Sequence, residues 1–473
     1  MLLPADRRSL LSERSGASVA AMSVPRRLTL AAVLLACLTA AALAQAPAPR
    51  WATSWTGSVQ GPYPVGNPSA QPDLRFAFPS PETGARDQTL RLMVRPSLWG
   101  QRARLRLSNA LGTRPVTFDG VFAGLQRSGS VVEPGSNQPV LFGAKASVTV
   151  PPGGSVWSDP VALPFVRGPA DQALLGRRLA VSLHVAGESG PMTWHAKALT
   201  TSYLTPPGAG AKGASDGILD FPFSTTSWYF LDAVDVDAPG DARVIVALGD
   251  SITDGTASTL NGDDRWPDVL LQRLHAAGAA RVAVANAGIG GNQVVGPATY
   301  SPQRPFPGGP SALDRLGRDV LDLSGVAAVI WLEGINDFSK NGGASAEQVI
   351  AGMRQGVARI RERFPGARVI GATVTTALGS TSPAHGSQEQ DRERRALNEF
   401  IRAGGLFDGV ADFDRATLDP ATGEMRPEFV PESTTGGPGE KLHPNRAGYE
   451  AMAASIALAP LLGAGPGSAA PAR

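Results

Sequence analysis

The sequence contains a single cysteine, Cys37, in 473 residues. One cysteine cannot form an intramolecular disulfide, and it excludes a zinc site built from several thiolates. Aromatic residues make up 6% of the chain and charged residues 18%, whereas hydrophobic residues make up 42%, which is the balance of a globular protein rather than a disordered one. Beyond the amino-terminal segment no apolar run approaches the roughly 20 residues that span a bilayer. We therefore expect no membrane span in the mature chain.

The longest apolar run lies close to the amino terminus. From Met22 the chain reads MSVPRR, continues with an apolar stretch, and reaches the small residues of 42–44. A basic start, an apolar centre and a small-residue cleavage site predict a secretory signal peptide over residues 1–44, with translation starting at Met22. The alternative is a lipoprotein with Cys37 as the attachment site, but the apolar run continues past Cys37 to a better cleavage site. We expect a secreted or periplasmic protein, cleaved after Ala44.

The charges of the mature chain nearly cancel. Residues 1–44 hold five of the 43 basic residues and two of the 41 acidic residues, which leaves 38 basic and 39 acidic residues. A nearly neutral surface offers no general electrostatic attraction to nucleic acid or to an anionic membrane, so neither is an expected partner. The sequence carries no signal for a particular oligomeric state.

Residues 45–238 have the pattern of an all-β domain. Glycine and proline, 55 and 40 residues, make up a fifth of the chain and favour turns and loops. Apolar and polar residues alternate over Thr89–Val94, Ala103–Ser108 and Leu179–Val185, as they do in half-buried strands. No stretch here sustains helical periodicity. The pattern predicts a jelly-roll-like β-sandwich that acts as an accessory domain.

Residues 239–462 alternate strands with helices. This alternation predicts an α/β domain with a parallel sheet of about five strands in a flavodoxin-like arrangement. We expect helices on both faces of the sheet and a site beyond the carboxyl ends of its strands. Residues 463–473 form a tail of small residues and proline that we expect to be disordered. The expected strands are Val244–Leu248, Val282–Asn286, Ala327–Leu332, Arg368–Val374 and Gly409–Phe413. The expected helices include Trp266–His275, Val349–Phe364 (opened by a capping box at Ser345–Gln348) and one from about Pro444 to about Leu462.

Three segments that follow expected strands could carry chemistry. Ser251, in Gly249–Gly255, follows the first strand, where it is either a nucleophile or a helix N-cap. The glycines of Gly288–Asn292 follow the second strand and either aim backbone N–H groups into an oxyanion hole or form a tight turn. Asn336 follows the third strand and either offers its amide as a donor or forms an Asx turn.

A serine nucleophile needs a base, and His443 is the best-placed of the five histidines. Pro444 biases His443 toward an extended conformation, outside the following helix. Glu440, three residues upstream, can orient the imidazole through its other nitrogen. The alternative is an exposed histidine in a capping arrangement. For the others we expect a strand or surface role (His184 and His195) or exposure to solvent (His275 in a helix and His385 in a polar loop).

Four segments, in this order, resemble the sequence blocks of the SGNH/GDSL hydrolases: Gly249–Gly255 (GDSITDG), Gly288–Asn292 (GIGGN), Gly334–Asp337 (GIND) and Leu442–Asn445 (LHPN). The resemblance covers roughly residues 243–462. It implies that Ser251 is the nucleophile and His443 the general base. It also implies an oxyanion hole formed by the N–H groups of Ser251 and Gly291 and the Asn336 side chain, with no metal and no cofactor.

One position departs from the family pattern. The family usually places Asp three residues before the histidine, and here that residue is Glu440. Glutamate is one methylene longer but chemically equivalent, and it is the third member of the triad in other serine hydrolases. The resemblance therefore assigns this role to Glu440, with Asp408, Asp412 and Asp414 as substitutes.

Three further segments, two of them within residues 45–238, also have a familiar pattern. Trp51–Trp55 (WATSW), Arg104–Ala110 (RLRLSNA) and Arg265–Asp268 (RWPD) resemble segments of bacterial secreted family members that carry a β-domain before the hydrolase domain. For this β-domain we expect a role in shaping the rim of the site or in packing, rather than in binding polysaccharide.

Together these features predict a secreted serine esterase that hydrolyses a small-molecule or polysaccharide ester. The signal peptide and the β-domain favour deacetylation of carbohydrate. The alternatives are a lysophospholipase or lipase, an acyltransferase with the same triad, and a catalytically dead carbohydrate-binding module.

Overall fold

The computed structural model describes residues 50–168 and 171–462. The expected signal peptide, the lipid-attachment alternative at Cys37 and the tail 463–473 lie outside these residues. Within the described ranges, none of the helices combines the length and the apolar character needed to cross a bilayer.

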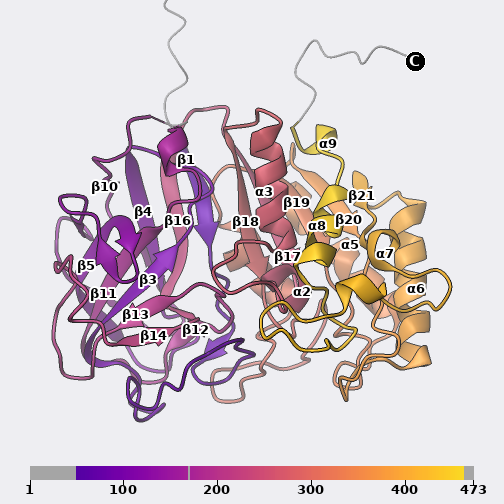
Figure 1. Cartoon of the computed structure of the whole chain (residues 1–473), viewed down its shortest axis with the longest axis horizontal. Helices are drawn as coiled ribbons and strands as arrows, with labels where there is room; N and C mark the ends of the chain where they lie inside the picture. The colour runs from indigo at the N-terminus through magenta and orange to yellow at the C-terminus, as the bar shows by residue number, and fades with distance from the viewer. Residues whose placement is uncertain (1–49, 169–170, 463–473) are drawn as a thin grey trace, which may run out of the picture. The chain divides into compact units, whose positions relative to one another are not determined.

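The first region is built from antiparallel strands, as expected, in two larger sheets and one small one (Figure 1). One sheet has the order β1-β16-β4-β10 with β9 beside β4; the second has the order β14-β13-β3-β11-β5-β6 with β7 and β8 beside β5; the third has the order β15-β12-β2. The strands are β1 (Arg50–Thr56), β2 (Gly61–Pro62), β3 (Arg86–Val94), β4 (Arg102–Ser108), β5 (Val116–Ser128), β6 (Val131–Val132), β7 (Gln138–Val140), β8 (Val148–Val150), β9 (Ser155–Trp157), β10 (Val161–Ala162), β11 (Leu179–Glu188), β12 (Thr193–His195), β13 (Ser202–Leu204), β14 (Phe223–Thr225), β15 (Trp228–Tyr229) and β16 (Leu231–Ala238), with a 3-10 turn η1 (Gln172–Leu174).

The second region is a parallel sheet with helices. Its strands are β17 (Arg243–Gly249), β18 (Val282–Gly288), β19 (Val326–Leu332), β20 (Arg368–Ala372) and β21 (Gly409–Ala411). Its helices are α2 (Ser251–Asp254), α3 (Trp266–Ala276), α4 (Ala312–Leu316), α5 (Ala346–Arg363), α6 (Gln388–Ala403), α7 (Phe413–Thr417), α8 (Arg446–Ala454) and α9 (Ala459–Leu462), with a π-helical segment η2 (Gly317–Leu321) and a 3-10 turn η3 (Pro427–Phe429).

The parallel sheet has the order β18-β17-β19-β20-β21, which is the flavodoxin-like arrangement. Because right-handed crossovers leave β17 in opposite directions, the helices fall into two groups on opposite faces. Helix α8 contacts α3 and α7, whereas α5 contacts α4 and α6. The order reverses at β17, and such a reversal opens a crevice beyond the carboxyl ends of the strands.

All five expected strands of this region are present, with ends shifted by at most two residues. Ser345 accepts from the Gln348 N–H and the Gln348 side chain reaches back, so the expected capping box opens α5. The single helix expected from Pro444 to Leu462 is wrong. Helix α8 ends at Ala454, and Pro460 lies in the first turn of a separate short helix, α9, where its missing N–H needs no partner.

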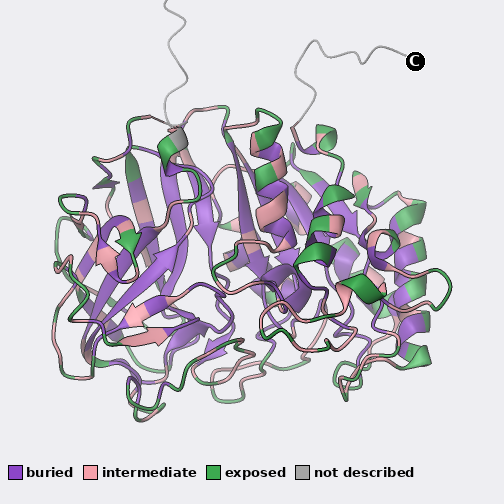
Figure 2. Ribbon diagram, viewed as in Figure 1, coloured by how far each residue is buried: buried purple, intermediate pink, exposed green. Residues whose placement is uncertain are grey.

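The two regions share one continuous hydrophobic core. Strand β1 packs beside β18, and the sheets of both regions are largely buried (Figure 2). Hydrogen bonds cross the contact as well: the Thr53 N–H donates to the Ser324 carbonyl at 3.0 Å, and the Ser97 hydroxyl donates to the Val284 carbonyl at 2.9 Å.

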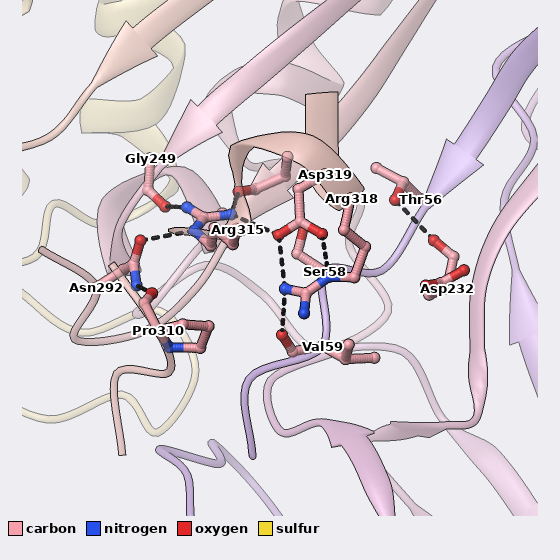
Figure 3. A network of polar contacts seen from close by, with 12 residues as sticks. Thr56, Ser58, Val59, Asp232, Gly249, Asn292, Pro310, Arg315, Arg318 and Asp319 are labelled. Atoms are coloured by element: carbon pink, nitrogen blue, oxygen red, sulfur yellow. Dashed lines mark hydrogen bonds and ion pairs between the residues drawn. The ribbon is translucent and has the colours of Figure 1, made fainter. Parts of the chain in front are cut away.

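A chain of buried charges reinforces this contact. Arg106 on β4 donates to Asp232 at 2.6 Å and to the Arg318 carbonyl at 3.0 Å. Arg318 in turn donates to Asp319 at 2.6 Å and to the Val59 carbonyl at 2.8 Å (Figure 3). Since both charges of the Arg106–Asp232 pair are buried, each depends on the other for compensation.

The substitution Arg106→Met tests this dependence. It leaves Asp232 buried without its cation, so we expect a loss of about 3–5 kcal/mol in the free energy of unfolding. The matched control is Arg102→Met on the same strand, because Arg102 is half exposed and its pair with Asp237 lies at the surface. For the control we expect a loss of about 1 kcal/mol or less. Denaturant unfolding measures both, and equal losses would contradict the ion-pair argument.

Candidate active site

The register of the parallel sheet brings the three loops of the candidate site together. Gly249 at the end of β17 pairs with Gly288 on β18 and with Leu332 on β19. The chain segments that follow these residues therefore leave the same edge of the sheet at the same level. They carry Ser251, the glycines 288–291 and Asn336.

Ser251 is the first residue of α2 and is buried. Asp250 takes the capping position, since its side chain accepts from the Ile252 N–H at 2.9 Å. The Ser251 hydroxyl is therefore not used as a cap, and its Oγ lies 2.8 Å from Nε2 of His443. The sharp turn requires glycine at 249, where a Cβ would lie 2.2 Å from Oγ1 of Thr253.

His443 lies outside α8 and links the serine to a carboxylate. Its Nδ1 is hydrogen-bonded to Oε1 of Glu440. The Glu440 carbonyl accepts from the Ser380 hydroxyl at 2.7 Å and from the Thr381 N–H at 3.1 Å, which fixes the loop. Burial opposes the negative charge of Glu440, but the hydrogen bond and charge of His443 outweigh it and lower the pKa of the carboxyl.

The three aspartates considered as substitutes bond elsewhere. Asp408 accepts from the Val369 N–H, and Asp412 accepts from Thr373 and Arg402. Asp414 pairs with Arg394 at 2.5 Å and with Arg402 at 2.8 Å. Of these acids, Glu440 is the one whose carboxylate meets His443.

The loop after β18 contains Gly291, whose N–H is one of the expected donors. Gly291 has φ +82°, and within the described parts of the chain its N–H has no acceptor. Asn336 lies beside this loop, since its Nδ2 donates to the Asn292 carbonyl at 2.9 Å. One amide hydrogen of Asn336 is used in this way, and the other remains for a ligand.

Arg315 fixes the base of these loops. The fully buried guanidinium donates to the carbonyls of Gly249 at 2.8 Å and Ala287 at 2.7 Å, and to Oδ1 of Asn292 at 2.7 Å (Figure 3). Asp319 lies 3.0 Å away and balances its charge. One side chain thus ties the end of β17 to the end of β18.

Asp337 fixes the continuation of the glycine loop. Its carboxylate accepts from the backbone N–H groups of Val294 at 2.9 Å and Val295 at 3.1 Å. Burial raises the pKa of Asp337 to about 7, and the nearby Glu333 charge adds to the shift, whereas the two backbone hydrogen bonds oppose it. Asp337 thereby ties the glycine loop to the segment that follows β19.

His385 is not the solvent-exposed loop histidine that the sequence suggested. It is partly buried, and Gln390 donates to its Nδ1 at 2.8 Å. Burial, together with the nearby His443, lowers the pKa of His385 to about 4. Its place beside Glu440 and His443 arises because the loop before α6 folds over the site, a tertiary contact that its polar composition does not reveal.

The first region contributes three residues that the sequence analysis did not assign to the site. Asn67 donates to the Gly290 carbonyl at 2.8 Å, and His195 lies 3.1 Å from Asp254 in α2. Lys197 is buried and donates to the Thr256 hydroxyl at 2.5 Å. His195 and Lys197 are two residues apart, which could have indicated that both side chains lie on one side of an extended segment. The spacing could not have indicated which part of the second region that side contacts.

A cavity of about 300 Å³ opens beside His443 and Glu440. Polar groups make up much of its wall, including Thr256 and Glu432, and its remaining lining residues are Ala257, Pro438 and Gly439.

The substitution Gly291→Ala tests the packing of the glycine loop. A left-handed φ costs a non-glycine residue about 1–2 kcal/mol. Here a Cβ would also lie 2.8 Å from Nδ2 of Asn67, which adds about 1 kcal/mol for the displaced hydrogen bond. Gly278→Ala is the control, because φ is +84° there and the space around it is open. We expect the larger loss of unfolding free energy at Gly291; equal losses would contradict the contact with Asn67.

Part of the chain is similar in sequence to a known protein family. A sequence model described as the GDSL-like lipase/acylhydrolase family matches residues 247–451, from β17 to α8. No curated protein matches the chain in sequence.

Several solved structures are similar to part of the chain. A carbohydrate acetylesterase from Sinorhizobium meliloti is 13% identical, with 45% of this chain and 94% of that chain covered and a TM-score of 0.34. A lipase/acylhydrolase from Enterococcus faecalis is 25% identical, with 45% and 92% covered and a TM-score of 0.33. An aryl esterase from M. smegmatis is 16% identical, with 45% and 96% covered and a TM-score of 0.34. On the match over residues 247–451, the second region of this chain is a domain of the GDSL-like lipase/acylhydrolase family.

Proposed function

We propose that this protein is a serine esterase that hydrolyses carboxylic esters, with Ser251 as nucleophile, His443 as general base and Glu440 as the residue that orients His443. The observation that carries the proposal is the chain of contacts from Oγ of Ser251 to Nε2 of His443, at 2.8 Å, and from Nδ1 of His443 to Glu440. Nucleophile, base and orienting carboxylate in hydrogen-bond contact are what acyl transfer requires.

The carboxylate selects the useful form of the histidine. Glu440 accepts a hydrogen bond from Nδ1–H, so the neutral ring leaves Nε2 free to take a proton from Ser251. The serine oxygen then bonds to the ester carbonyl carbon, and the tetrahedral intermediate collapses as the alcohol leaves with the proton held on Nε2. Water repeats the sequence on the acyl-enzyme, with His443 again as base, and releases the acid.

The negative oxygen of each tetrahedral intermediate needs donors that are already in place. We assign this role to the N–H groups of Ser251 and Gly291 and to Nδ2 of Asn336. Loss of one such donor typically costs about 100- to 1000-fold in rate.

The cavity beside His443 supports an ester in polar surroundings. Thr256 and Glu432 offer groups that hydrogen-bond hydroxyls, whereas a long acyl chain requires an apolar trough. We therefore propose a short-chain ester of a hydroxyl-rich compound, with an acetylated carbohydrate as the favoured class. Export through the signal peptide over residues 1–44, and an accessory β-domain over residues 45–238, belong to the same proposal.

Ester hydrolysis by the mature protein and its variants tests the roles. Ser251→Ala should lose activity on p-nitrophenyl acetate by about a million-fold, to background. Glu440→Ala should lose about 1,000- to 10,000-fold, because the imidazole loses its orientation. Asp412→Asn is the matched control, since this acid lies in the same region but pairs with Arg402, and we expect it to retain activity.

Rates on p-nitrophenyl esters of increasing acyl length test the substrate class. A fall in kcat/KM beyond acetate and propionate supports a short acyl group, whereas a rise toward octanoate would favour a lipid ester. Equal rates for the parent and Ser251→Ala would refute the assignment of the nucleophile. Transfer of the acyl group to an added alcohol in preference to water would identify an acyltransferase.

A further inference from the structure

His195, in the first region, contacts the helix that carries Ser251. The ring is buried at the end of β12. Its Nδ1 lies 2.7 Å from the Ser58 carbonyl, and its Nε2 lies 3.1 Å from the Lys197 carbonyl and 3.1 Å from Oδ1 of Asp254. Asp254 is the last residue of α2.

The three polar groups that contact the His195 ring are two backbone carbonyls and the carboxylate of Asp254. All three accept hydrogen bonds and none donates one. A neutral imidazole carries one N–H and would leave its other nitrogen facing oxygen lone pairs. Both nitrogens are satisfied only when both carry a proton, so the geometry requires an imidazolium. The ring also stacks on Trp228 with centroids 5.3 Å apart, a placement that favours a cation.

Asp254 connects His195 to the glycine loop. Its Oδ1 meets His195, and its Oδ2 accepts from the Gly290 N–H at 2.8 Å. A carboxylate accepts a stronger hydrogen bond from a backbone N–H than a neutral oxygen does, so Asp254 fixes the Gly290 N–H firmly.

Asn67 fixes the next peptide. Its Nδ2 donates to the Gly290 carbonyl at 2.8 Å. In a trans peptide the carbonyl and the following N–H point in opposite directions. A carbonyl held by Asn67 on one side therefore turns the Gly291 N–H to the other side.

We propose that His195, as a buried imidazolium acting through Asp254, and Asn67 are positioning residues that aim the Gly291 N–H at the reacting carbonyl oxygen. This inference rests on the proposed function. It makes the first region part of the catalytic apparatus, because two consecutive peptides of the donor loop are held from it.

The proposed positioning of Gly291 depends on pH, because it depends on the charge of His195. Burial alone would lower the pKa of His195, but the charge and hydrogen bond of Asp254 and the two carbonyl contacts raise it above the ordinary value. The contribution of the charged His195 ring to the stability of the folded protein is therefore complete below pH about 6.5. It is lost as the pH rises through the pKa of His195 in the folded state. The charged groups around the ring, from every element packed against it, are Asp254, Lys197, Arg95, Asp263, Arg265 and Asp268.

The test compares two buried histidines of the first region. His195→Gln leaves one acceptor unpaired and the loop less fixed, so we expect kcat on p-nitrophenyl acetate to fall about 10- to 100-fold with KM within twofold of the parent. Affinity for phenylboronic acid, which forms a tetrahedral adduct on the serine, should fall in parallel. The matched control is His184→Gln on β11, where the histidine contacts Asp119 and Asp87 instead; kcat, KM and boronate affinity should stay unchanged.

Asn67→Ala provides a second route should His195→Gln fail to fold, because Asn67 is only partly buried in a loop. We expect a fall of about 10-fold in kcat at unchanged Tm. In a double-mutant cycle, Asp254→Asn combined with His195→Gln should cost much less than the product of the two single losses, because both act along one path.

Nitrogen-15 spectra decide the charge independently of catalysis. At pH 6.5, where an ordinary histidine is half charged, the imidazolium form of His195 should predominate in the parent, and its signal should disappear in His195→Gln. The Gly291 amide resonance should shift in His195→Gln and Asn67→Ala but not in His184→Gln. A predominantly neutral His195 at pH 6.5, or unchanged kcat and boronate affinity in both site-directed variants, would overturn the proposal. A parent with these spectra but no esterase activity would instead overturn the proposed function.

Discussion

The arrangement of the site depends on one buried cation. Arg315 accepts no hydrogen bond and has five N–H donors, and it uses four of them on Gly249, Ala287, Asn292 and Asp319. The Gly249 carbonyl at the end of β17 also accepts from the Ile289 N–H at 3.0 Å, and the planar guanidinium joins it to the Ala287 carbonyl on β18. Without Arg315, Oδ1 of Asn292 would lose its buried donor, and the loops that carry Ser251 and Gly291 would lose a common anchor.

The same cation connects the two regions. Asp319 balances Arg315 and also binds Arg318, whose guanidinium reaches the Val59 carbonyl and whose own carbonyl accepts from Arg106. A path of charged side chains and backbone carbonyls thus runs from the antiparallel sheets to the end of β17, and Figure 3 shows its part from Val59 to Gly249. The position of the first region and the shape of the donor loop are consequently set by one network, since moving either would leave a charge without its partner.

Much of this could be predicted from the sequence, and the remainder could not for a physical reason. Alternation of apolar and polar residues predicted strands of the first region, and alternation of strands with helices predicted the parallel sheet of the second. The four sequence blocks singled out Ser251, Gly291, Asn336 and His443, because strand ends and tight turns are encoded locally. Local pattern also suggested Glu440, three residues before the histidine. The break before Pro460 was missed because the apolar pattern continued through it. His385, Asn67 and His195 were missed because their relation to the site arises from packing between segments far apart in the chain, for which a single sequence has no periodic signal.

The packing of β1 against β18 has a consequence for how such proteins can be recombined. Two regions with their own sheets are often treated as interchangeable modules. Here, however, the two regions share one hydrophobic core, and backbone hydrogen bonds and charged side chains of each contact the other. The second region cut out at its first strand would expose an apolar sheet edge and would lose the first-region residues that contact its glycine loop. Exchange of the first region between relatives is therefore expected to succeed only when β1, the Ser324 turn and the segment around His195 are inherited together, as a single heritable block.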